Sequence, residues 1–295
     1  MSSNQPEIQS VPQPMTDTEL DNYKLHRRFD RMGRLIGDSK MKRLMDAHVM
    51  IIGLGGVGSW SAESIMRSGV GRVTLVDFDE ICVTNFNRQL HALQGLVGRQ
   101  KAEVLAERML KINPQAQVKA VPLFYNADHC AEIFADRPDY VIDAIDNVTA
   151  KCHLLAYCRK EGIPLVCSTG SGGRMDPTQV KVADLSETQH DPLARAIRRI
   201  LREQYGFPAE GKGRFGIPAI FSMETSTKPE ELTYDGGKGF RCVCPQGDNE
   251  FFNCDSRNLI LGNASFVTGT FGLIAASVAV KALIADPAAP AESHS

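Results

Sequence analysis

The stretch that decides the fold is "IIGLGGVGSWSAESIMRSGVGRVTLVDFDEICVTNFNRQ", which runs from Ile51 to Gln89. Its apolar start is typical of a buried strand, and it leads into the pattern Gly53-x-Gly55-x-x-Gly58, with Gly56 inside it. Glycines at this spacing let the backbone turn tightly and approach phosphate groups at the start of a helix. The pattern therefore predicts a strand, a phosphate-binding turn and a helix in direct succession.

Polar side chains crowd the second half of this stretch. Asp77 and Asp79 end the next apolar run, and Asn85, Arg88 and Gln89 follow closely. A carboxylate at the end of the second strand can accept hydrogen bonds from ribose hydroxyls, as in dinucleotide-binding proteins. A dinucleotide that is merely held does not need the extra amides and the cation, whereas a triphosphate does. The stretch favours a site where a triphosphate is broken.

Two later segments add to the same site. Lys101 begins the next helical pattern, and "DAIDN" puts Asp143 and Asp146 at the end of another strand. A carboxylate there can hold Mg²⁺ against phosphate oxygens, so Asp146 is the predicted metal ligand. Each residue also has a structural interpretation: Asp143 can cap a helix, Lys101 can be solvated, and Arg88 can pair with an acidic neighbour. It is the combination that points to phosphate chemistry.

Between residues 48 and 169, β-rich apolar runs alternate with segments of helical length. Alternation of this kind predicts a mostly parallel, doubly wound α/β sheet with helices on both faces. After Gly170 the alternation stops, and glycine and proline become frequent. The runs are "HVMIIG" (48–53), "RVTLVD" (72–77), "AQVKAVP" (116–122), "YVIDAI" (140–145) and "PLVCST" (164–169).

Composition and charge bound the class of protein. The chain has 295 residues and a net charge of -2, so any site for a polyanion must be a local patch. We expect one domain over residues 19–284, a disordered N-terminal arm over 1–18 and a flexible tail over 285–295. The eight cysteines are scattered through core-like segments, which favours a reducing, cytoplasmic environment.

An uncharged apolar segment lies near the C-terminus. The run from Leu259 to Val280 carries no charge and is long enough to cross a bilayer, but Gly262, Asn263 and several other small or polar residues interrupt it. We expect a buried core helix or a dimer-interface helix. The alternative is membrane association through residues 259–284.

A basic segment lies between Asp191 and Arg214. Apolar residues fill one helical face, and arginines recur at helical spacing on another. Such a stripe can follow RNA phosphates on a protein of near-zero net charge, and the alternative is a solvated charged face. The candidate RNA-binding residues in the stripe are Arg195, Arg198, Arg199 and Arg202. Arg174 of "GSGGRMDP" is a further candidate contact for RNA or for a substrate carboxylate, and the alternative is that it caps a helix or pairs within its loop.

The first half of the chain resembles the ubiquitin-activating, or E1-like, adenylating enzymes. The matching segments are "RFDRMGRLIG", "GLGGVGS", "VDFDEICVTNFNRQ", "VGRQKAE", "INP" and "DAIDN". The resemblance implies a homodimer of E1-like Rossmann domains that binds ATP and magnesium. It further implies that Asp77 binds ribose, that Asn85, Arg88, Gln89 and Lys101 bind phosphates, that Asp146 binds magnesium, and that Arg31 reaches the ATP of the other subunit.

The second half narrows the branch of that family. "STGSGGRMDPTQVKVADLSETQHDPLARAIRRILRE", "FSMETSTKP" and "GNASFVTGTFGLIAASVAV" resemble the bacterial tRNA threonylcarbamoyladenosine dehydratases. That resemblance implies ATP-dependent cyclisation of N6-threonylcarbamoyladenosine (t6A) in the tRNA anticodon loop through an acyl-adenylate, with a monovalent cation and a cysteine desulfurase as further candidate partners.

The alternative branch is an adenylyltransferase that activates the C-terminal Gly-Gly of a sulfur-carrier protein. Those enzymes carry paired cysteine motifs for zinc, and the spacing of Cys242, Cys244 and Cys254 does not match them. These cysteines could instead accept an acyl group or sulfur. Ring closure by a nitrogen already tethered to the substrate needs no enzyme nucleophile, so we do not expect them to be catalytic.

Overall fold

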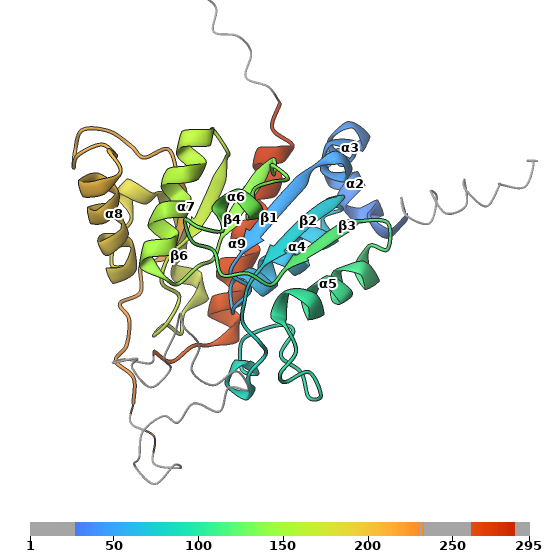
Figure 1. Ribbon diagram of the computed structural model, residues 1–295, viewed down its shortest axis with the longest axis horizontal. Helices are drawn as coiled ribbons and strands as arrows, with labels where there is room; N and C mark the ends of the chain where they lie inside the picture. Colours follow the sequence, from blue (N-terminus) through green and yellow to red (C-terminus); the bar gives the residue numbers. More distant parts are fainter. Residues whose placement is uncertain (1–26, 231, 233–260, 287–295) are drawn as a thin grey trace, which may run out of the picture.

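The computed structural model describes residues 27–230, 232 and 261–286, and within this part the chain forms an α/β fold around one seven-stranded sheet (Figure 1). The order across the sheet is β3-β2-β1-β4-β5-β7-β6, parallel except for the β6/β7 pair. The strands are β1 (His48–Ile52), β2 (Arg72–Val76), β3 (Gln117–Val121), β4 (Tyr140–Asp143), β5 (Leu165–Ser168), β6 (Val180–Asp184) and β7 (Pro218–Ser222). The five predicted strands and the mostly parallel sheet are confirmed.

Helices cover both faces of the sheet. They are α2 (Asp30–Ile36), α3 (Asp38–Asp46), α4 (Gly58–Arg67), α5 (Lys101–Ile112), α6 (Cys130–Ile133), α7 (Val148–Glu161), α8 (Pro192–Gln204) and α9 (Ser265–Leu283), with short 3-10 turns η1 (Val83–Asn85), η2 (Pro177–Gln179) and η3 (Leu185–Glu187). Alternate residues of β1 point to opposite faces: Val49 and Ile51 belong to the core shared with α4, α5 and α9, whereas Met50 and Ile52 belong to the core shared with α6, α7 and α8. A strand buried on both sides explains the unbroken apolar run in the sequence.

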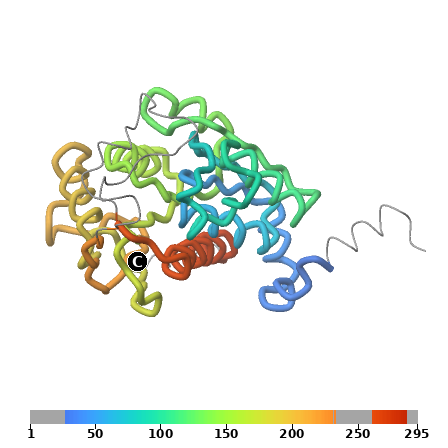
Figure 2. Tube along the Cα trace, turned by 90° about the horizontal axis from the view of Figure 1, so that it is seen from below, coloured from blue at the N-terminus to red at the C-terminus, as the bar shows by residue number. Residues whose placement is uncertain are grey.

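Helix α9 packs lengthwise against α4 on one side of the sheet (Figure 2). The contact is close: a Cβ on Gly272 would overlap the Val57 carbonyl oxygen, and Ser61 Oγ donates a hydrogen bond of 3.0 Å to the Gly272 carbonyl. By length and composition α9 could cross a membrane, and half of it is buried inside the described structure. This packing favours the expected core helix over a membrane segment.

Strands β6 and β7 were not predicted, because glycine and proline obscure the pattern after Gly170. A single carboxylate organises their junction: Asp184 accepts hydrogen bonds from the backbone N–H groups of Phe215, Gly216 and Ile217 at 3.0, 2.7 and 3.2 Å. Burial would raise the pKa of Asp184, but these bonds and those from Ser186 outweigh it and lower the pKa. The pair extends the parallel sheet by an antiparallel edge.

Several expectations lie outside the described residues. These are the N-terminal arm over 1–18, nearly all of the tail over 285–295, and the three cysteines Cys242, Cys244 and Cys254.

Candidate functional site

One cavity of about 940 Å³ opens at the carboxyl ends of β1, β2, β4 and β5. In the sheet order, β1 lies between β2 and β4, so the connections leave it in opposite directions. Crevices at such switch points are where open α/β sheets bind ligands. The predicted ATP-site residues meet here. Those that line the cavity are Gly53, Gly55, Gly56, Asp77, Asp79, Asn85, Arg88, Gln89, Lys101 and Asp146.

The glycine turn has the backbone that the motif requires. Gly53 has a φ of 86°, a region that side-chain-bearing residues rarely adopt, and a Cβ on Gly58 would overlap the Gly53 carbonyl oxygen. Helix α4 begins at Gly58, and no side chain caps its N-terminus. The turn therefore presents backbone N–H groups to the cavity at the positive end of a helix dipole.

Asp77 and Asp79 follow the same strand, β2, but their carboxylates have different surroundings. The carboxylate of Asp77 is buried and accepts hydrogen bonds from Leu54 N at 2.6 Å and Asp79 N at 2.9 Å. It therefore ties the glycine turn to the end of β2, and burial raises its pKa. The side chain of Asp79 is 41% exposed and lines the cavity, so its carboxylate is more accessible to a ligand than that of Asp77.

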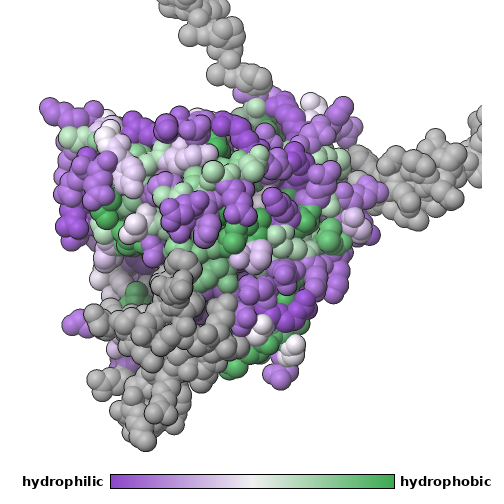
Figure 3. Space-filling model, viewed as in Figure 1, coloured by the Kyte–Doolittle hydropathy of each residue, from purple (hydrophilic) through white to green (hydrophobic). Residues whose placement is uncertain are grey.

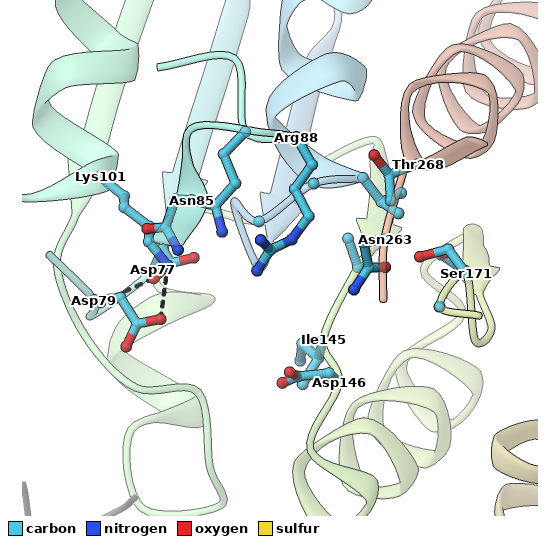
Figure 4. A pocket seen from close by; sticks show the side chains of 18 of the residues that line it. Asp77, Asp79, Asn85, Arg88, Lys101, Ile145, Asp146, Ser171, Asn263 and Thr268 are labelled. Atoms are coloured by element: carbon cyan, nitrogen blue, oxygen red, sulfur yellow. Dashed lines mark hydrogen bonds and ion pairs between the residues drawn. The ribbon is translucent and has the colours of Figure 1, made fainter. Parts of the chain in front are cut away.

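Lys101 lies at the start of α5, with its side chain directed at the two aspartates (Figure 4). Its Nζ donates to Asp79 Oδ2 at 2.7 Å, and only 6% of the side chain is exposed. Burial works against the ammonium charge, but Asp77 and Asp79 outweigh burial and raise the pKa of Lys101. The lysine is thus held in its charged form in the same cavity as the glycine turn.

Arg88, Asn85 and Gln89 come from the η1 segment and the turn after it. The guanidinium of Arg88 reaches into the middle of the cavity, where Nη1 donates to Thr84 O at 2.8 Å and Asn87 Oδ1 at 3.0 Å (Figure 4). Asn85 Oδ1 accepts from Cys82 N at 2.9 Å, which fixes the turn. Gln89 is 6% exposed, and within the described chain its Oε1 has no hydrogen-bond partner.

Asp146 and Asp143 have different surroundings despite sharing the "DAIDN" motif. Asp146 is exposed on the cavity floor. Asp143 is fully buried, where its Oδ2 accepts from Lys151 Nζ at 2.6 Å and its Oδ1 from Ile145 N at 3.1 Å. The cap of α7 is Asn147, whose side chain accepts from Ala150 N, so helix capping by Asp143 was wrong. Asp143 fixes the loop that presents Asp146.

The opposite wall of the cavity carries polar residues that the sequence analysis missed. Ser171, Asn263 and Thr268 come from the loop after β5 and the start of α9 (Figure 4). Two backbone hydrogen bonds of this wall measure 2.7 Å, Gly173 N to Gly262 O and Thr227 N to Gly173 O. The signal for Asn263 was present as a Gly-Asn pair that interrupts an apolar run, but residues so far apart in sequence are joined only by the fold.

The other predicted residues lie away from the cavity lining. Arg31 is exposed on α2. The arginines of α8 split into two kinds: Arg195 and Arg199 are exposed, whereas Arg198 donates to Thr188 O at 3.0 Å and Arg202 to Pro208 O at 3.3 Å. The predicted stripe of four outward arginines is therefore reduced to two.

Arg174 is 3% exposed and contacts its own loop and Asp191. Its guanidinium therefore cannot contact RNA from this position, and the loop-pairing alternative is the one that the structure favours.

Comparisons with known proteins identify the family. The model of the ThiF family matches residues 29–294. The chain belongs to the ThiF family. It is 43% identical over 261 residues to the tRNA threonylcarbamoyladenosine dehydratase of Escherichia coli K12, and the match covers 88% of this chain and 95% of that one.

Two further matches agree. The tRNA threonylcarbamoyladenosine dehydratase of Bacillus subtilis is 42% identical over 228 residues, covering 76% of this chain and 87% of the relative. The crystal structure of the E. coli enzyme in complex with ATP superposes with a TM-score of 0.75 at 41% identity, covering 88% of this chain and 94% of that one. The expected E1-like ThiF fold is thus confirmed.

Proposed function

We propose that this protein carries out the ATP-dependent dehydration of t6A in tRNA to its cyclic form. The observation that carries the proposal is the 43% identity to a tRNA threonylcarbamoyladenosine dehydratase across almost the full length of both chains. The cavity supports it, because cationic and amide groups gather beyond a glycine turn.

The chemistry requires activation of a poor electrophile. A carboxylate oxygen of the threonylcarbamoyl group attacks the α-phosphorus of ATP, pyrophosphate leaves, and an acyl-adenylate forms. The ureido nitrogen of the same side chain then attacks the acyl carbon, its proton is lost, and AMP leaves as the five-membered ring closes. Oxygen from the substrate departs in AMP, which gives a net loss of water from the nucleoside. Because both reacting groups are tethered, closure needs little more than orientation.

Each side chain has a role in this scheme. Arg88 and Lys101 neutralise phosphate charge, Gln89 and Asn85 supply amide groups, and Asp79 accepts from the ribose. The described residues contain no group of three metal-ligating side chains. A lone carboxylate nevertheless fits Mg²⁺, which typically binds one or two carboxylates plus substrate phosphates and keeps its waters. Asp146 would hold that ion, which neutralises phosphate charge when bound. A monovalent cation remains a further candidate.

One assay separates this function from its alternatives. Purified protein is incubated with ATP, magnesium and either t6A-containing tRNA or a carrier protein that ends in Gly-Gly. We expect AMP with the tRNA, and mass spectrometry of the digested nucleosides should show t6A converted to a species lighter by one water. AMP formed with the carrier alone would instead identify a sulfur-carrier adenylyltransferase.

We also propose that the active form is a homodimer, with Arg31 completing the ATP site of the partner subunit. Exposed apolar side chains support this: Val83, Phe86, Leu93 and Val97 follow β2 in sequence, and apolar surface lies at the lower edge of the molecule (Figure 3). Apolar patches of this kind mark interaction surfaces. Light scattering at twice the chain mass, and inactivity of Arg31→Ala that is rescued by mixing with Lys101→Met, would support shared sites.

The exposed face of α8, with Arg195 and Arg199, is the proposed contact for tRNA phosphates. Exchange of both for serine should raise the KM for tRNA and leave ATP affinity unchanged. A cytoplasmic location follows from a tRNA substrate. A cysteine desulfurase partner is a separate proposal that rests only on the sequence resemblance.

A further inference from the structure

A buried carboxylate joins the wall of the cavity to the basic helix α8. Asp191 caps α8, because its Oδ1 accepts from Ala194 N at 2.8 Å. Its Oδ2 accepts from Gly170 N at 2.9 Å and lies 2.9 Å from Thr169 Oγ1. Gly170 and Thr169 line the cavity. One side chain thus joins the loop after β5 to the start of α8, 21 residues further along the chain.

Arg174 closes the arrangement from the other side. Its Nη2 lies 3.4 Å from Asp191 Oδ2, and the two side chains are 2% and 0% exposed. The same guanidinium donates to the carbonyl oxygens of Gly170 and Gly172, and Nε donates to Glu224 O at 3.2 Å. We call Thr169, Gly170, Arg174 and Asp191 the Asp191 latch. The hydrogen bonds of this buried pair join the loop after β5, the start of α8 and the backbone at Glu224.

The backbone conformation of His190 indicates that the surrounding contacts hold Asp191 in place. His190, the residue before Asp191, has a φ of 53°, the sole non-glycine residue with positive φ in the described ranges. Its carbonyl lies 3.4 Å from Arg174 Nη2. Non-glycine residues persist in this region where the surroundings over-determine the backbone, and such strain gathers at functional sites.

Helix α8 is also part of the cavity. Leu193, in its first turn, lines the cavity together with the 168–172 loop. The helix therefore presents Arg195 and Arg199 to solvent within two turns of a residue that lines the cavity. Arg198 binds back to Thr188 and fixes the helix further.

We propose that Asp191 is a positioning residue that fixes the cavity wall relative to α8, so that tRNA held on the helix delivers its threonylcarbamoyl group to ATP in one register. The inference rests on the proposed function and on tRNA contact by α8. It differs from a simple stability role, because misplacement of bound substrate lowers turnover more than it lowers binding.

The test uses a substitution that separates the latch from the helix cap. In Asp191→Asn, Oδ1 can still cap α8, since asparagine caps as well as aspartate, but Nδ2 faces three hydrogen-bond donors. We expect kcat with t6A-containing tRNA to fall roughly 10- to 100-fold, as small misplacements do, with the KM for tRNA and the Kd for ATP within about threefold of wild type. Glu203→Gln, an exposed charge change on α8, should leave all three unchanged.

Two further variants keep the test decisive. Asp191→Ser retains a capping hydroxyl without the mispaired amide, and it should show the same kcat loss if Asp191→Asn does not fold. The double variant Asp191→Asn with Arg174→Gln should lower kcat no further than the more damaging single substitution does. Both substitutions disrupt the same set of contacts, so their effects are not additive.

An unchanged kcat in both Asp191 variants, or a loss that lies wholly in the KM for tRNA or in ATP affinity, would overturn the inference. AMP formation by the wild type with tRNA is measured first. If the wild type forms no AMP, the proposed function is wrong, and the role of Asp191 is not the cause.

Discussion

Two lysine–aspartate pairs, one after the end of β2 and one at the end of β4, have nearly the same distance and different surroundings. Lys101 and Asp79 are 2.7 Å apart, and Asp79 is 41% exposed in the cavity. Lys151 and Asp143 are 2.6 Å apart, and both are fully buried. A lysine whose partner is solvated can share its charge with an incoming phosphate, whereas a sealed pair cannot. The comparison teaches that solvent access to the partner, more than pair distance, separates a chemical role from a structural one.

The largest expected effect is on stability, at the sealed pair. Lys151→Met leaves the Asp143 carboxylate buried and unpaired, so the free energy of unfolding should fall by about 3–5 kcal/mol in urea titrations. The double variant Lys151→Met with Asp143→Leu should recover much of that loss. A single variant as stable as wild type would break the comparison.

At the cavity pair the expected loss is in activity. Lys101→Met should lower the rate of AMP formation about 10²- to 10³-fold, as removal of a group that stabilises transition-state charge does. The free energy of unfolding should fall by less than the about 3–5 kcal/mol expected at the sealed pair, because water can solvate Asp79 and the buried Asp77 carboxylate keeps two backbone hydrogen bonds. Lys111→Met, an exposed lysine on the same helix, is the matched control and should behave as wild type. If Lys101→Met were as active as this control, the phosphate role would be lost.

The two neighbouring aspartates sharpen the comparison further. Asp79→Asn removes a charged acceptor for the ribose, so ATP should bind more weakly by about 1.5–3 kcal/mol in calorimetry. Asp77→Asn should act mainly on stability, since the Asp77 carboxylate holds the glycine turn through Leu54 N. Equal losses of ATP affinity in both variants would contradict this division.

The smallest expected effect concerns His91, a buried residue whose protonation the charge of Lys101 disfavours. Burial, and then Lys101, lower the pKa of His91 to about 3, and within the described chain neither ring nitrogen has a hydrogen-bond partner. Below the ordinary histidine pKa of 6.5, His91 is protonated in the unfolded chain but stays neutral in the folded protein. The free energy of unfolding therefore falls as the pH drops from 6.5 towards 3. Between pH 6.5 and 5 the loss is about 2 kcal/mol, and His91→Leu should remove it from pH-dependent unfolding curves. An unaltered pH dependence would show that another group titrates.

Much of the fold could be predicted from the sequence, because each of β1 to β5 is a short apolar run with turn residues at its ends. The nucleotide side of the cavity was predictable for the same reason: its residues follow strand ends in sequence order. The different surroundings of Asp77 and Asp79 could not be predicted from spacing, since both residues end the same run. Burial and the hydrogen bonds that Asp77 accepts from Leu54 N and Asp79 N distinguish them.

The far wall could not be predicted. Asn263, Ser171 and Thr268 belong to segments that are separated by nearly a third of the chain, and no local pattern tells that they meet. The predictions for Arg174 and Arg198 were wrong for a related reason. The sequence does not distinguish an arginine that is exposed from one whose guanidinium binds backbone carbonyls.

The packing of α9 beneath α4 has a consequence for how the protein is made. Helix α4, which follows the glycine turn, packs on residues that are synthesised long after it, and Gly272 lies directly against Val57. Long-range contacts of this kind form late and slow the folding of a chain. A nascent chain that stops before residue 265 would expose the apolar underside of α4, so we expect such truncated products to need chaperones and to bind nucleotide poorly.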